Sequence, residues 1–80
     1  MSNSIFQSPY QCLAFASALH LESLGMIASK TYPAFKKQVK AELNVPVKGT
    51  NRQLKDAFKG YLQENWSQDL LESCTRLGRL

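Results

Sequence analysis

The stretch VKGTNRQLKDAFKGYL, residues 47–62, predicts an amphipathic helix and with it a helical fold. Thr50 followed by Gln53 forms a capping-box pattern, which starts the helix at residue 51. Gly60 interrupts the pattern at some cost in helix stability, and we expect a neighbouring helix to pack closely against it. The apolar residues recur on one helical face: Leu54, Ala57, Phe58, Tyr61 and Leu62.

Working outward from this helix, three more segments show helical patterns with start and stop signals. Ser8 and Pro9 begin the first, and Gly25 ends it. Pro33 suits the first turn of the next, and Pro46 lies beyond its end. Ser67 can cap the last, and Gly78 ends it. The predicted helices span residues 9–24, 32–44, 51–64 and 68–77. The sequence therefore predicts an all-α fold, a compact bundle of about four short helices. We expect a single domain over 1–80, with residues 1–7 as a loose N-terminal segment.

A winged-helix-like fold with a short β element is the alternative. FKKQVKAEL (35–43) followed by TNRQLKDAFKGYL (50–62) is similar to two helices of the globular domain of linker histones, which is a winged helix. NVPVK (44–48) is the short stretch that could form a strand. ENWSQDLLESCTRL (64–77), however, has a helical pattern where the two-stranded wing would follow.

Positive charge is concentrated in the middle of the chain. The net charge is +4, but residues 30–59 hold eight basic and two acidic side chains, a net charge of +6. Such a cluster suits phosphates, because each bound cation releases counterions, and Asn or Arg at a helix start can reach base edges. A solvated helix face would show the same composition. The candidate nucleic-acid-binding residues are Lys36, Lys37, Lys40, Lys48, Asn51, Arg52, Lys55 and Lys59.

The helix over 9–24 suggests a second function, because it is apolar around most of its circumference. Such a helix is either the central core helix or shared with a partner. One apolar stripe holds Tyr10, Leu13, Ala14, Leu21 and Leu24, and the other holds Cys12, Phe15, Ala16 and Leu19. The alternative function is therefore a small regulatory or inhibitory protein that binds an acidic protein partner, or a second copy as a homodimer, through Cys12, Phe15 and Leu19.

Catalytic signals are weak. His20 is the single histidine, Cys12 and Cys74 each fall in an apolar pattern, and no Gly-rich phosphate loop occurs. We therefore predict a non-enzymatic protein with no metal and no cofactor. No apolar run reaches about 18 residues, so no membrane partner is predicted. The first apolar stretch follows no basic segment, and two cysteines make no disulfide framework, so we expect a cytoplasmic location.

Overall fold

The computed structural model describes residues 5–27 and 29–80, so residues 1–4 of the predicted loose segment lie outside it. The helices in this part are α1 (Pro9–Ser23), α2 (Tyr32–Glu42), α3 (Asn51–Asn65) and α4 (Gln68–Gly78). The predicted all-α bundle is confirmed, and each predicted helix end lies within two residues of the observed one. The winged-helix alternative is wrong, because α4 takes the place of the wing and residues 5–27 and 29–80 form no strand.

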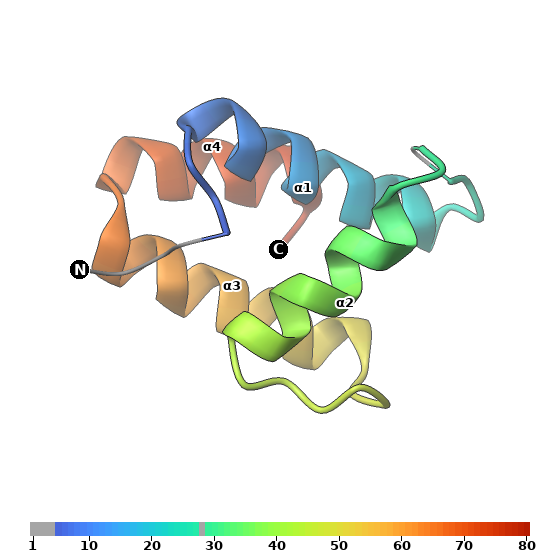
Figure 1. The fold of residues 1–80 in the computed structure, drawn as a ribbon. Coiled ribbons are helices and arrows are strands. Elements are labelled where there is room, and N and C mark those ends of the chain that lie inside the picture. Colours follow the sequence, from blue (N-terminus) through green and yellow to red (C-terminus); the bar gives the residue numbers. More distant parts are fainter. Residues whose placement is uncertain (1–4, 28) are drawn as a thin grey trace.

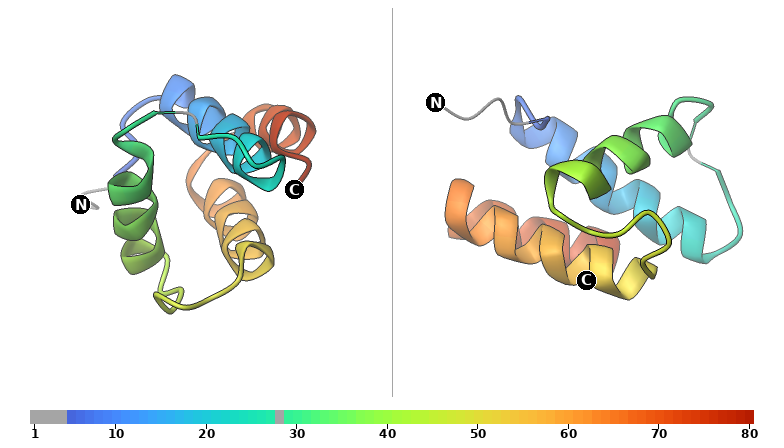
Figure 2. Two further views of the ribbon diagram at one scale, coloured as in Figure 1. Left: turned by 90° about the vertical axis from the view of Figure 1, so that its right-hand side faces the viewer. Right: turned by 60° about the horizontal axis from the view of Figure 1, so that its bottom comes forward.

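The helices are arranged around one core (Figure 1). α1 and α4 lie side by side and run in the same direction, and α3 runs back against α4 after a short turn. α2 lies on the opposite side of the core from α3 and α4 (Figure 2, left). Core side chains from α1, α2, α3 and α4 fill the space between them.

Local signals determine where the helices begin. Ser8, Thr50 and Ser67 each accept a hydrogen bond from the backbone N–H three residues later. The capping box at Thr50 has both of its hydrogen bonds, since the Thr50 N–H also donates to Gln53 Oε1 at 2.8 Å. α2 is different: Thr31 holds the cap position in a helical conformation and its side chain makes no capping bond. Three helix starts therefore follow from sequence chemistry alone.

Left-handed residues end three of the helices. Gly25 follows α1 with φ of 81°, and Asn44 follows α2 with φ of 60°. A positive φ strains most side chains, and glycine and asparagine tolerate it best. At α4 the left-handed residue is Arg79, with φ of 52°, so Gly78 is the last helical residue rather than the stop.

Gly78 serves the packing of α4 on α1. A Cβ atom at Gly78 would lie 2.8 Å from the Ala16 carbonyl oxygen and 3.1 Å from the Ala16 Cβ. The missing side chain is thus what lets the two helices approach. The close packing expected at Gly60 does not occur, because a Cβ there would meet nothing within 4 Å.

Phe6 lies at the centre of an aromatic cluster, which corrects the prediction of a loose segment up to residue 7. Its side chain is 2 % exposed. Its ring centroid lies 5.3 Å from that of Phe58, 5.5 Å from Tyr61 and 5.6 Å from both Phe15 and Phe35. Offset and edge-to-face contacts at these distances are favourable. Phe6 therefore links the aromatic side chains of α1, α2 and α3.

The two apolar stripes of α1 have different environments. The stripe of Cys12, Phe15, Ala16 and Leu19 is buried in the core. The opposite stripe faces outward at both of its ends, where Tyr10 is 81 % and Leu24 is 61 % exposed. An apolar helix of this kind normally has both faces covered.

Candidate functional site

A polar network at one end of the core holds three helices together, and Glu22 of α1 accepts most of its hydrogen bonds. Lys36 Nζ of α2 lies 2.9 and 3.0 Å from the two carboxylate oxygens of Glu22. The hydroxyl of Tyr32 donates to the same carboxylate at 2.9 Å, and the amide of Asn51 donates at 3.1 Å. Lys36 also donates to Asn51 Oδ1 at 2.7 Å. Lys36 and Asn51 therefore have structural contacts inside the protein.

The network shifts the pKa values of two of its members. Burial alone would raise the pKa of Glu22, but hydrogen bonds from Lys36, Tyr32 and Asn51 outweigh it, so this pKa lies below its ordinary value of 4.5. Burial, and then the Glu22 carboxylate, raise the pKa of Tyr32. Glu22 is the only charged residue among residues 1–29, which was the one sequence signal for this role.

Glu22→Gln is expected to lower the free energy of unfolding at neutral pH by roughly 1–2 kcal/mol, because Lys36 loses a partly exposed ionic partner. The folded-state pKa of Glu22 is lowered, so its contribution is present above the unfolded-state pKa and is lost as pH falls through the folded-state value. Urea unfolding from about pH 7 to about pH 3 should therefore show the difference between wild type and variant shrinking with acid. Exposed Glu64→Gln is the control, and an equal loss in both variants would contradict the assignment.

Lys40 also has a structural role. Its side chain is buried, and Nζ donates to the carbonyl oxygens of Val47 and Gly49, each at 3.0 Å. These bonds hold the loop between α2 and α3 against α2. Buried charges need such partners, so Lys40 stabilises the loop and is not displayed at the surface.

The other predicted basic residues are displayed at the surface. Lys37, Lys48 and Arg52 are exposed, and Lys55 and Lys59 are half-buried. Arg52 Nε lies 3.9 Å from Asp56 Oδ2, and these side chains are 81 % and 65 % exposed, so their ion pair is weak. We call Arg52, Lys55 and Lys59 the α3 basic stripe. Successive members lie three and four residues apart, a spacing that places them on one helical face.

Protein groups hold one backbone N–H and the Asn51 side chain at the start of α3. The Gln53 N–H donates to the Thr50 hydroxyl at 3.1 Å. The Asn51 side chain is held by Glu22. Asn51, which was predicted to contact nucleic acid, therefore has its side chain bonded inside the protein.

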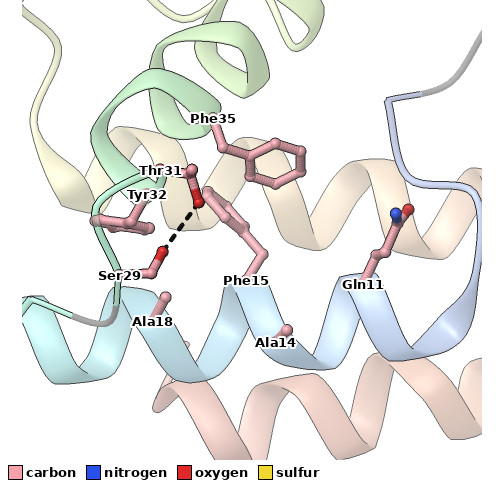
Figure 3. Close-up of a pocket in the computed structure, with 8 residues that line it drawn as sticks. All are labelled: Gln11, Ala14, Phe15, Ala18, Ser29, Thr31, Tyr32 and Phe35. Atoms are coloured by element: carbon pink, nitrogen blue, oxygen red, sulfur yellow. Dashed lines mark hydrogen bonds between the residues drawn. The ribbon is translucent and has the colours of Figure 1, made fainter.

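Two shallow grooves border α2. Figure 3 shows the first, of about 270 Å³, where Phe15 and Phe35 form part of the wall and the Ser29 and Thr31 hydroxyls lie 3.1 Å apart. The second, of about 300 Å³, lies where the exposed side chains of Ile27 and Val47 border Lys37. Its wall also contains Lys36 and Lys40, whose amino groups bond within the protein.

The thiols are unreactive in this structure. Burial, followed by the proximity of Cys74, raises the pKa of Cys12 to about 12. Burial likewise raises the pKa of Cys74 to about 11. Both are free, so at neutral pH they behave as small apolar side chains. Among residues 5–27 and 29–80, no group of three metal-ligating side chains comes together, and no helix is long and apolar enough to cross a membrane.

The structure corrects the predicted partner interface. Cys12 and Leu19 are 0 % exposed and Phe15 is 2 % exposed. A partner could not reach them without unfolding the core. Sequence periodicity found both stripes of α1 but assigned the interface to the buried one.

Comparison with known proteins finds no matching family model, no significantly similar curated protein and no significantly similar solved structure.

Proposed function

We propose that this protein is a non-enzymatic nucleic-acid-binding protein that contacts phosphates through the α3 basic stripe and Lys48. The observation that carries the proposal is the difference between two sets of cations. The amino groups of Lys36 and Lys40 bond to partners inside the protein. Within residues 5–27 and 29–80, Lys48, Lys55 and Lys59 have no such partner, and Arg52 has only a weak one.

The α3 basic stripe has dimensions that suit a phosphate backbone. From Arg52 to Lys59 the helix rises about 10 Å, at about 1.5 Å per residue. The same length of duplex carries roughly six phosphate charges. Lysine stems can lie along apolar surface while their amino groups reach solvent, so half-buried Lys55 and Lys59 remain able to bind phosphate.

The expected binding is independent of base sequence. Asn51, the residue best suited to read adenine, is held by Glu22 and Lys36. Lysine is a point charge without the planar fork of arginine, so it contacts phosphates more readily than it specifies bases. The cations that remain therefore supply affinity and orientation, and sequence-random duplexes should bind alike.

The test compares two variants with the same loss of charge. Arg52→Gln, Lys55→Gln, Lys59→Gln removes the α3 basic stripe, and Lys30→Gln, Arg76→Gln, Arg79→Gln removes three exposed cations that are not among the candidate binding residues. Binding to labelled duplex DNA and to labelled RNA is measured by fluorescence anisotropy. The first variant should bind at least tenfold more weakly at low salt, and the slope of log K against log salt should fall by about 2.7, or 0.9 for each lost contact.

The control variant should lose much less affinity, because it keeps the α3 basic stripe. Circular dichroism must show that both variants retain the wild-type helix content. Equal losses in the two variants would contradict a localised site and leave only a general charge effect. Unchanged binding by the first variant would contradict the proposal outright.

A further inference from the structure

The outward face of α1 is an apolar surface that no described helix covers. We call Tyr10, Ala14, Ser17, Leu21 and Leu24 the α1 outer stripe. Tyr10, Ala14 and Leu24 are exposed, and Ser17 and Leu21 are half-buried. In Figure 2 (left), α1 forms the upper edge of the molecule, with α4 beside it and α2 below. No member of the α1 outer stripe is charged, and Ser17 at its centre is a small polar residue.

The order of residues along the stripe is close to symmetric about Ser17. Tyr10 and Leu24 lie seven residues to either side, and Ala14 and Leu21 lie three and four residues away. Two such helices that meet antiparallel near Ser17 bring each Tyr10 against the other copy's Leu24. They also bring each Ala14 against the other copy's Leu21. The small side chains near the centre allow the two helices to approach.

The absence of charge on the α1 outer stripe favours a second copy of the chain as its partner. Each copy carries a net charge of +4, which disfavours contact between basic surfaces. The α1 outer stripe has no cation, so two copies can meet there without placing like charges in contact. For the same reason it offers nothing to select an acidic protein. We propose that a second copy of this chain covers the α1 outer stripe in an antiparallel homodimer with its two-fold axis near Ser17.

The size of the surface predicts weak association. A helix of 15 residues is about 22 Å long. One face of it buries less than the roughly 800 Å² per partner of a standard interface. Ala14 also borders the groove of about 270 Å³, which gives the opposing Leu21 an apolar recess. Dissociation constants in the micromolar range or weaker are expected, so association should appear only in concentrated samples.

Sedimentation equilibrium without nucleic acid tests this dimer independently of the proposed function. With increasing concentration, the wild-type weight-average mass should rise from the monomer value of 9.0 kDa towards twice that value. Ala14→Glu should raise the dissociation constant at least tenfold, because it places a charge in each half of the interface. Val47→Glu, which adds the same charge at an exposed apolar residue of the α2–α3 loop, should leave it unchanged.

A wild-type chain that stays monomeric in concentrated solution would overturn the proposal. A dimer equally stable in Ala14→Glu would overturn it too, since it would use another surface. Leu24→Glu is the second variant if Ala14→Glu fails to fold, and it should weaken the dimer in the same way. Circular dichroism identifies a folding failure before association is measured.

Disulfide crosslinking tests the antiparallel orientation. Under mild oxidation, a mixture of Tyr10→Cys and Leu24→Cys chains should form covalent heterodimers faster than either variant alone forms homodimers. The buried native thiols, Cys12 and Cys74, should give little background. Faster crosslinking of Tyr10→Cys with itself would overturn the antiparallel arrangement, because that pairing requires parallel helices.

Discussion

Phe6→Ala is expected to lower the free energy of unfolding by about 3–5 kcal/mol, as large-to-small changes at buried aromatic residues do. Phe6 contacts four other aromatic rings from three helices, so its removal leaves a cavity where α1, α2 and α3 meet. A domain of this length has a total stability of roughly 4–12 kcal/mol. The substitution therefore removes a large share of it, and the thermal midpoint should fall by more than about 12 °C.

Urea denaturation followed by circular dichroism measures this loss. Phe6→Leu keeps part of the apolar volume and should cost less than half as much, which keeps the test usable if Phe6→Ala does not fold. Tyr10→Ala removes an aromatic side chain that is 81 % exposed, and in dilute samples it should change stability by less than about 0.5 kcal/mol. Wild-type stability in Phe6→Ala would contradict the central position of Phe6.

Gly78→Ala is expected to lower the free energy of unfolding by about 1–3 kcal/mol, the usual cost of overpacking. The new Cβ would lie 2.8 Å from the Ala16 carbonyl oxygen, so α4 must move away from α1 or distort. Backbone atoms cannot move aside as a flexible side chain can. The loss should therefore outweigh the gain that alanine brings to a helix.

Gly60→Ala is the matched control, because a Cβ at Gly60 meets nothing within 4 Å. Alanine there should raise the free energy of unfolding by up to about 1 kcal/mol, as expected for an exposed helix interior. The two glycine variants should thus change stability in opposite directions. Stabilisation by both would contradict the close contact between α1 and α4.

Helix positions were predictable from sequence because the signals are local. Thr50 with Gln53, and Ser67 before an apolar run, specify helix starts through bonds within one turn. Periodicity likewise identified Leu54 and Phe58 as core residues. Phe6 was missed because a single aromatic residue in a polar segment has no periodicity, although Ile5 and Phe6 together just before the Ser8 cap were a signal.

The candidate site was less predictable because it depends on tertiary contacts. From the sequence alone, Lys36 and Lys40 could not be told apart from the other cations. Only the fold places Glu22 beside Lys36 and the loop carbonyl oxygens beside Lys40. The two stripes of α1 are similarly apolar, so composition could not decide which one faces the core. Gly60 and Gly78 show the same limit, since their different surroundings come from the packing of neighbouring helices.

The salt dependence of wild-type binding to a short labelled DNA duplex tests whether Lys48 and the α3 basic stripe bind phosphates. With phosphate contacts from Lys48 and the α3 basic stripe, log K should fall with log salt at a slope of about −3.6. The affinity should then drop roughly 100-fold between about 50 and about 200 mM salt. Absence of binding at low salt, or binding that does not change with salt, would contradict phosphate binding by these residues.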